Sequence, residues 1–122
     1  MNASRIKAKG LKRLINAGGY SIAGLQDAWR TEEAFRQEII LAFILIPVSF
    51  LIDTTAVGHA LLVASVLFVL LIELLNTAIE TVIERISDDI HPLSKRAKDL
   101  GSAAVFVSLI NVAAVWGIIL LL

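Results

Sequence analysis

The sequence contains no cysteine and few charged residues. Without cysteine, the 122-residue chain has no disulfide, no thiol nucleophile and no sulfur ligand for a metal ion. Charged residues make up 18% of the chain and hydrophobic residues 57%, with a mean hydropathy of +0.82. A soluble domain of this length needs more polar side chains to cover its surface. The composition therefore excludes an ordinary soluble domain and favours a single domain in a membrane, residues 1–122.

Three further absences narrow the function. The formal net charge is zero, so no excess of positive charge indicates a nucleic-acid partner. Neither GxxxxGK[ST] nor GxGxxG occurs, so the chain has no P-loop and no protein-kinase phosphate loop. The basic N-terminus is not followed by a long apolar run within the first thirty residues, which argues against a cleaved signal peptide.

What the sequence does contain is three apolar runs. Seventeen uncharged residues lie in 56–72, twenty-three in 100–122 and fourteen in 39–52. A hydrocarbon core of about 30 Å requires about 20 helical residues. The shortest run reaches that length if its helix extends back to residue 34, with Arg36 and Glu38 at the interface. We predict an all-α membrane protein with three transmembrane helices, at about 34–53, 56–86 (including a cytoplasmic extension) and 94–121.

The positive charges predict the orientation of these spans. Seven of the eleven Lys and Arg residues precede the first apolar run (39–52), and the other four lie between the second (56–72) and the third (100–122). The turn at 53–58 and the C-terminal end have none. Because cytoplasmic loops carry the excess of Lys and Arg, the N-terminus and the 85–98 region are expected in the cytoplasm and the C-terminus outside.

The N-terminal region predicts an amphipathic surface helix over about 5–30. Its apolar residues recur at helical spacing and end at Trp29, which is expected at headgroup depth. We expect Gly18-Gly19 to break or bend this helix, and Thr31 to be the N-cap of the first span.

An acidic face on the second span is the strongest functional signal. Glu73, Asn76, Glu80 and Glu84 are spaced i, i+3, i+7 and i+11, so they share one side of a helix. Glu73 lies at the edge of the hydrocarbon, where an ionisable group costs about 2.5–3.5 kcal/mol and so indicates function. The structural alternative is that the helix emerges into water and these acids are a solvated face.

The acidic face leaves two function classes open. Like charges on one face repel unless a cation lies between them, and a set of oxygen ligands suits Mg²⁺. Lys95, Arg96 and Lys98 begin the third helix and could bind phosphate, or could be positive-inside charges only. The residues therefore allow a Mg²⁺-dependent enzyme or a small proton- or cation-coupled transporter. A transporter would move substrate across sealed vesicles without consuming ATP.

Four segments resemble the prokaryotic diacylglycerol kinase family, the small membrane-embedded lipid kinases of bacteria. They are ELLNTAIE at 73–80, RAKDLGSAAV at 96–105, AGGYSIAGL at 17–25 and EAFRQE at 33–38. The resemblance covers nearly the whole chain. It implies a homotrimeric bundle in the bacterial inner membrane, each subunit having three spans and a surface helix. It also implies transfer of the γ-phosphoryl group of MgATP to the primary hydroxyl of diacylglycerol.

The resemblance also implies a role for each matching residue. Glu73 would be the general base, supported by Asn76, and Mg²⁺ would be held by Glu32 and Glu80. ATP would contact Arg13, Tyr20, Glu32, Glu80, His91, Lys98 and Asp99. Lipid would contact Arg13, Ser21, Trp29, Arg36, Gln37, Glu38, Glu73 and Ser102.

Two residues depart from the family pattern. Ile90 stands where an aromatic residue is expected, which puts adenine stacking in that loop in doubt, and Glu84 stands where Asp is expected. A related reaction stays open, because Gram-positive relatives phosphorylate undecaprenol; the surface helix and the EAFRQE block favour diacylglycerol. Since the acidic and basic residues lie on different helices, we expect each active site to be shared between subunits.

Overall fold

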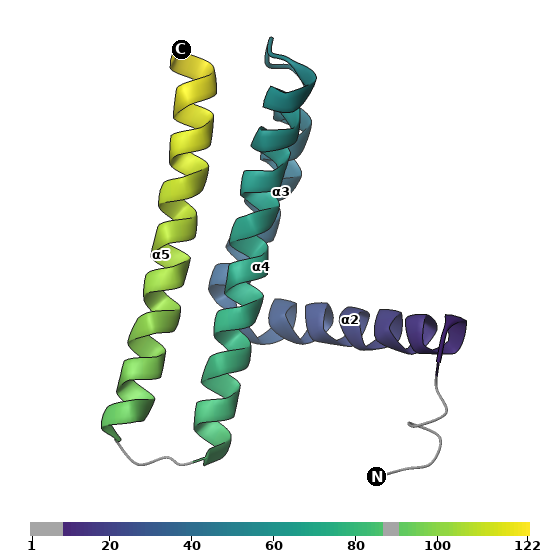
Figure 1. Cartoon of the computed structure of the whole chain (residues 1–122), viewed down its shortest axis with the longest axis vertical. Coiled ribbons are helices and arrows are strands. Elements are labelled where there is room, and N and C mark those ends of the chain that lie inside the picture. Colours follow the sequence, from purple (N-terminus) through teal and green to yellow (C-terminus); the bar gives the residue numbers. More distant parts are fainter. Residues whose placement is uncertain (1–8, 87–90) are drawn as a thin grey trace. The chain divides into compact units, whose positions relative to one another are not determined.

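The computed structural model describes residues 9–86 and 91–122, and all regular secondary structure there is helical (Figure 1). The four helices are α2 (Leu11–Thr31), α3 (Glu33–Ser49), α4 (Ala56–Ile86) and α5 (Pro92–Leu121). The chain divides into two compact units, the first ending at Glu33 and the second running from Ala34 to Leu122. The all-α prediction is confirmed. The single membrane domain over 1–122 stays a prediction.

Helix α2 is the predicted amphipathic helix. It begins after Gly10, whose φ of 59° is a backbone conformation that glycine adopts without strain. Helix α2 continues without interruption through Gly18 and Gly19, so the expected break was wrong. Glycine lowers helix stability by about 1 kcal/mol per residue but does not prevent helical φ and ψ angles. Residues 5–8 of the predicted helix lie outside the described part of the chain.

The two faces of α2 carry different chemistry. Arg13 and Tyr20 are seven residues apart, so they share one side of the helix. The opposite side carries exposed apolar side chains, namely Leu11, Leu14, Ile15, Ile22, Leu25 and Trp29. A helix with one apolar and one polar face suits a membrane surface.

Thr31 has a different role from the predicted one. It is the last residue of α2, and its Oγ1 donates a hydrogen bond to the carbonyl of Asp27, 2.9 Å away. The expectation that Thr31 caps the following helix was therefore wrong. Glu32 is extended and separates α2 from α3, so the chain turns one residue later than the N-cap pattern indicated.

Helix α3 ends earlier than the predicted span. Its last residue is Ser49, and three i to i+3 backbone hydrogen bonds carry the chain on to Ile52. Thr55 then caps α4, because its Oγ1 accepts a hydrogen bond from the Gly58 N–H at 3.1 Å. The ring nitrogen Nδ1 of His59 lies 3.0 Å from the Ser49 carbonyl oxygen and ties the end of α3 to the start of α4.

Helices α4 and α5 are the longest elements. With 31 and 30 residues and span hydropathies of 2.4 and 2.5, they are the two helices of the described residues that are long and apolar enough to cross a membrane. Helix α4 has the predicted bounds of 56–86. Helix α5 begins two residues before the predicted position, because Pro92 suits the first helical turn and His91 caps it.

Helices α4 and α5 lie side by side (Figure 1). Small residues line the contacts within the second unit, among them the fully or almost fully buried Ser49, Ser65 and Ser108. Each of these hydroxyls donates to the carbonyl three residues earlier, over 2.6–2.9 Å. The serines therefore satisfy their own polar groups while allowing the helices to approach closely, as is typical of packing in membranes.

Candidate active site

The acidic face predicted from the sequence is present on α4. Glu73, Asn76 and Glu80 are half-buried, whereas Glu84, one turn further on, is exposed. Three of the four residues are therefore partly shielded from solvent, and Glu84 is solvated. Seven residues of helix place Glu73 and Glu80 about 10 Å apart along the axis.

A second carboxyl group lies beside Glu73. It belongs to Glu38 on α3, which interacts with Glu73 electrostatically and through a side-chain hydrogen bond. The Glu38 atom Oε2 is buried and has no hydrogen-bond partner among the residues that the structure describes. Glu38 also lines a cavity of about 80 Å³ with apolar residues of α3, α4 and α5. The two carboxyl groups therefore lie close enough to interact, although they belong to different helices.

Asn76 contacts Glu80. Its amide nitrogen Nδ2 donates a long hydrogen bond, 3.4 Å, to Oε1 of Glu80. The other end of the amide, Oδ1, is buried and has no conventional hydrogen-bond partner in the described part of the chain. One oxygen of Glu80 is thus oriented by Asn76, which leaves Oε2 for a cation.

Gly101 on α5 is the residue that faces Asn76. A Cβ atom added at Gly101 would collide with Oδ1 of Asn76 and would lie 3.2 Å from its Cγ. Gly101 is buried, and the neighbouring helix approaches closely at this point. Gly101 therefore allows α5 to approach α4 closely.

Asp99, another candidate residue of α5, lies on a different side of that helix. Asp99 precedes Gly101 by two residues, which places it about 200° around the helix, away from α4 of the same chain. Asp99 is exposed and accepts a 2.6 Å ion pair from Lys95. Ser102 and Lys98 are also exposed. The structure thus brings Glu73, Asn76 and Glu80 together but does not add Asp99 to them within one chain.

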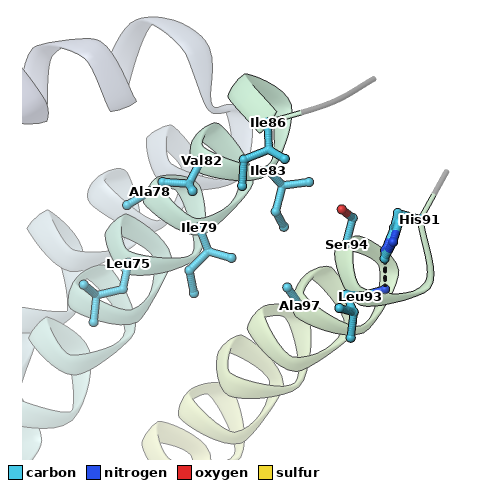
Figure 2. Close-up of a pocket in the computed structure, with 10 residues that line it drawn as sticks. All are labelled: Leu75, Ala78, Ile79, Val82, Ile83, Ile86, His91, Leu93, Ser94 and Ala97. Atoms are coloured by element: carbon cyan, nitrogen blue, oxygen red, sulfur yellow. Dashed lines mark hydrogen bonds between the residues drawn. The ribbon is translucent and has the colours of Figure 1, made fainter. Parts of the chain in front are cut away.

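An apolar groove lies between the end of α4 and the start of α5 (Figure 2). Its volume is about 830 Å³. His91 stands at its rim, where Nδ1 accepts a hydrogen bond from the Leu93 N–H at 3.0 Å. No Asp or Glu of residues 9–86 and 91–122 lines this groove. The lining residues are Leu75, Ala78, Ile79, Val82, Ile83, Ile86, His91, Leu93, Ser94 and Ala97.

Several candidates belong to the first unit or to the start of α3. Arg13, Tyr20, Ser21 and Trp29 lie on α2, and Glu32 follows its end. The pairing of Glu32 with Glu80 at a metal ion therefore stays a prediction. Gln37 is exposed on α3 and Arg36 is half-buried there. Ile90 lies outside the described residues.

The donor atoms present suit Mg²⁺. Over residues 9–86 and 91–122, no three His, Cys, Asp or Glu side chains converge on one point. Mg²⁺ requires only one or two protein carboxylates when phosphate oxygens and water complete its shell. Glu80, with one oxygen oriented by Asn76 and one available, fits such a site.

Sequence reasoning missed two relationships at this site. Glu38 was assigned to the lipid only, and its approach to Glu73 joins two helices that no spacing rule connects. Gly101 was given no role at the site, although it packs against Asn76. A glycine inside the predicted third helix was the available signal, because a glycine lets another helix approach closely.

Comparison with known proteins identifies the family. The prokaryotic diacylglycerol kinase family matches residues 19–120. The diacylglycerol kinase of Pseudomonas aeruginosa is 51% identical over 122 residues, which cover 99% of each chain. That of Haemophilus influenzae is 51% identical over 93% of this chain and 97% of its own, and that of Escherichia coli K12 is 44% identical over 91% of both. The chain therefore belongs to the prokaryotic diacylglycerol kinase family and is a bacterial membrane protein.

Proposed function

We propose that this chain transfers the γ-phosphoryl group of ATP to the primary hydroxyl of diacylglycerol, giving phosphatidic acid and ADP. The observation that carries this function is the similarity along almost the whole chain to proteins named diacylglycerol kinase. The matched relatives give no support to a transporter. They also favour diacylglycerol over a polyprenol as the acceptor lipid.

In the proposed mechanism Glu73 is the general base. The lipid hydroxyl oxygen forms the new bond to phosphorus, the bond from phosphorus to the β,γ-bridging oxygen breaks, and the hydroxyl proton passes to the Glu73 carboxylate. Glu38 lies beside Glu73 and holds it in place. The depth of Glu73, near the edge of the apolar part of α4, suits a hydroxyl that belongs to a lipid.

The nucleotide half of the site lies nearer to the water. Glu80 and Glu32 would hold Mg²⁺, with Asn76 orienting Glu80. When bound, Mg²⁺ would neutralise phosphate charge during the transfer. Arg13, Tyr20, His91, Lys98 and Asp99 contact the nucleotide. The position of Arg13 and Tyr20 on the polar face of α2 supports this role. Trp29, on the apolar face of the same helix, contacts lipid together with Ser21, Arg36, Gln37 and Ser102.

The chain assembles as a homotrimer whose sites are shared between subunits. Two observations support this proposal. Asp99 points away from the acidic face of its own chain, so it can complete the site of a neighbour. Helix α4 is about 46 Å long, so its last turns extend beyond a hydrocarbon core of about 30 Å. In these last turns the apolar side chains of Val82 and Ile86 are 58% and 74% exposed. A second copy of the chain would cover this apolar surface.

The topology follows the positive-inside rule. Helix α3, with the turns that extend it to Ile52, spans the inner membrane together with α4 and α5, while α2 lies on the cytoplasmic surface. The N-terminus is then cytoplasmic and the C-terminus periplasmic.

The function is tested by measuring ADP release from purified protein in mixed micelles. We expect release with MgATP and diacylglycerol together, and little with either omitted. Undecaprenol in place of diacylglycerol tests the acceptor. If ADP release does not depend on a lipid alcohol, the proposed reaction is wrong.

A further inference from the structure

Gly101 on α5 faces the side chain of Asn76 on α4. Outside the backbone of its own helix and its chain neighbours, the three heavy atoms nearest to a Cβ built on Gly101 all belong to Asn76, namely Oδ1, Cγ and Cβ. The oxygen lies too close to this Cβ position for a side chain to fit, so it faces the Cα of Gly101 directly. A Cα–H group is a weak hydrogen-bond donor to a carbonyl oxygen. A Cα–H group of Gly101 is thus the weak donor that faces Oδ1 of Asn76, an oxygen without a conventional hydrogen-bond partner in the described part of the chain.

The contact decides which end of the Asn76 amide faces Glu80. With Oδ1 against the Gly101 backbone, the Nδ2 group is directed at Glu80 and donates to Oε1 at 3.4 Å. The reversed amide would place its N–H groups against Cα–H and its oxygen against a carboxylate, which is unfavourable at both ends. A side chain at position 101 would push the amide out of this position.

We propose that Gly101 is a positioning residue for the nucleotide half of the site. Its bare Cα on α5 seats the Asn76 amide, which in turn holds the Glu80 carboxylate toward the Mg²⁺–nucleotide complex. This inference rests on the proposed metal role of Glu80. Under this proposal α5 does more than pack against α4: through Gly101 it helps to orient Glu80, the metal ligand on α4.

The test measures the affinity for a non-hydrolysable MgATP analogue by calorimetry on the assembled protein in micelles, together with the KM for MgATP. Gly101→Ala should weaken binding about ten-fold, the scale expected for losing one hydrogen bond to a charged group. Gly117→Ala is the matched control, because nothing lies within 4 Å of a Cβ at that position of the same helix. It should leave the affinity unchanged.

The double variant Asn76→Ala/Gly101→Ala shows whether the effect passes through Asn76. Removing the Asn76 side chain makes room for the new Cβ, so the double variant should bind the analogue as Asn76→Ala alone does. If Gly101→Ala does not fold, the double variant should recover folding. A double variant that remains unfolded, or that binds ten-fold more weakly than Asn76→Ala, would show that Gly101 does not act through Asn76.

Two further outcomes separate this inference from the proposed function. Gly101→Ala that lowers the thermal stability but leaves the affinity unchanged, while Glu80→Gln weakens binding, would make Gly101 a packing residue only. Glu80→Gln that leaves the affinity unchanged would remove the metal role of Glu80 and this inference with it. Lipid-dependent ADP release would still stand as a separate observation in either case.

Discussion

The indole N–H of Trp116 on α5 donates a hydrogen bond to the backbone carbonyl of Leu62 on α4, with 3.3 Å between Nε1 and the oxygen. The same carbonyl accepts a hydrogen bond from the Ser65 hydroxyl at 2.9 Å. Leu62 is completely buried. A polar contact of this kind fixes both the register and the rotation of two helices whose other contacts are mainly apolar.

Replacing Trp116 by Phe should therefore destabilise the packing of α4 and α5. The variant loses the indole donor but keeps an aromatic ring, so we expect a loss of about 1 kcal/mol in the free energy of unfolding. Chemical denaturation in micelles measures it. Phe106→Leu is a suitable control, because Phe106 is 64% exposed on the same helix. Equal losses in the two variants would show that the hydrogen bond contributes nothing.

The different depths of Glu73 and Glu80 predict different kinetic effects. Glu73→Gln should abolish turnover and leave the MgATP affinity within a few-fold, because it removes a base and no metal ligand. Glu80→Gln should weaken MgATP binding itself, and excess Mg²⁺ should partly restore activity. Glu84→Gln removes an equal charge from the exposed end of the same face and should change neither quantity.

The assignment of these roles has a clear point of failure. If Glu73→Gln loses nucleotide affinity as severely as Glu80→Gln, Glu73 is a ligand of the nucleotide or metal rather than a base. Binding calorimetry and turnover must therefore be measured on the same preparations.

The contact between Glu38 and Glu73 predicts that Glu38 acts on the chemical step. Glu38→Leu should lower kcat at least ten-fold and leave the KM for MgATP unchanged, because Glu73 loses the group that holds it. Glu38→Gln should retain more activity than Glu38→Leu, since an amide can still donate a hydrogen bond to a carboxylate. Equal kcat values for the two variants would mean that the hydrogen bond has no role in positioning Glu73.

The orientation of the spans is tested by reporter fusions. Fusions after Gly58 and after Leu122 should report a non-cytoplasmic location, and a fusion within 87–92 a cytoplasmic one. A cytoplasmic C-terminus is incompatible with three spans and a cytoplasmic N-terminus.

The long helices and the acidic face could be predicted from the sequence because both are properties of one helix. An uncharged run defines α4, and spacing alone places Glu73, Asn76 and Glu80 on one side of it. The helix ends were harder to predict. Gly18-Gly19 permits a helix as well as a break, and Thr31 can bond back to Asp27 as readily as it can cap the next helix.

Contacts between helices could not be predicted from spacing. The approach of Glu38 to Glu73 depends on the rotation of α3 against α4, and that of Gly101 to Asn76 on the register of α5 against α4. Both quantities are decided by the packing of side chains along the whole helix pair. The residues of one helix alone therefore do not determine the rotation of α3 or the register of α5 against α4.

The position of Asp99, facing away from the acidic residues of its own chain, predicts complementation between inactive variants. Glu73→Gln and Asp99→Asn should each be inactive alone. When equal amounts are mixed in denaturant and reconstituted, each half of a shared site is intact half of the time. About one site in four is then fully intact, and we expect about a quarter of the wild-type activity.

The control for this experiment is a mixture of Glu73→Gln and Glu80→Gln. Both substitutions lie on the same face of α4, so every site in the mixture carries one defect or the other, and no activity should return. Recovery in the first mixture but not in the second requires a site made from two chains. No recovery in the first mixture, with mixed oligomers shown to form by affinity tags, would place Asp99 and Glu73 in the same subunit's site. The shared-site proposal would then be wrong, because both residues would act within one chain. Asp99 would have to reach the acidic face from the far side of its own helix.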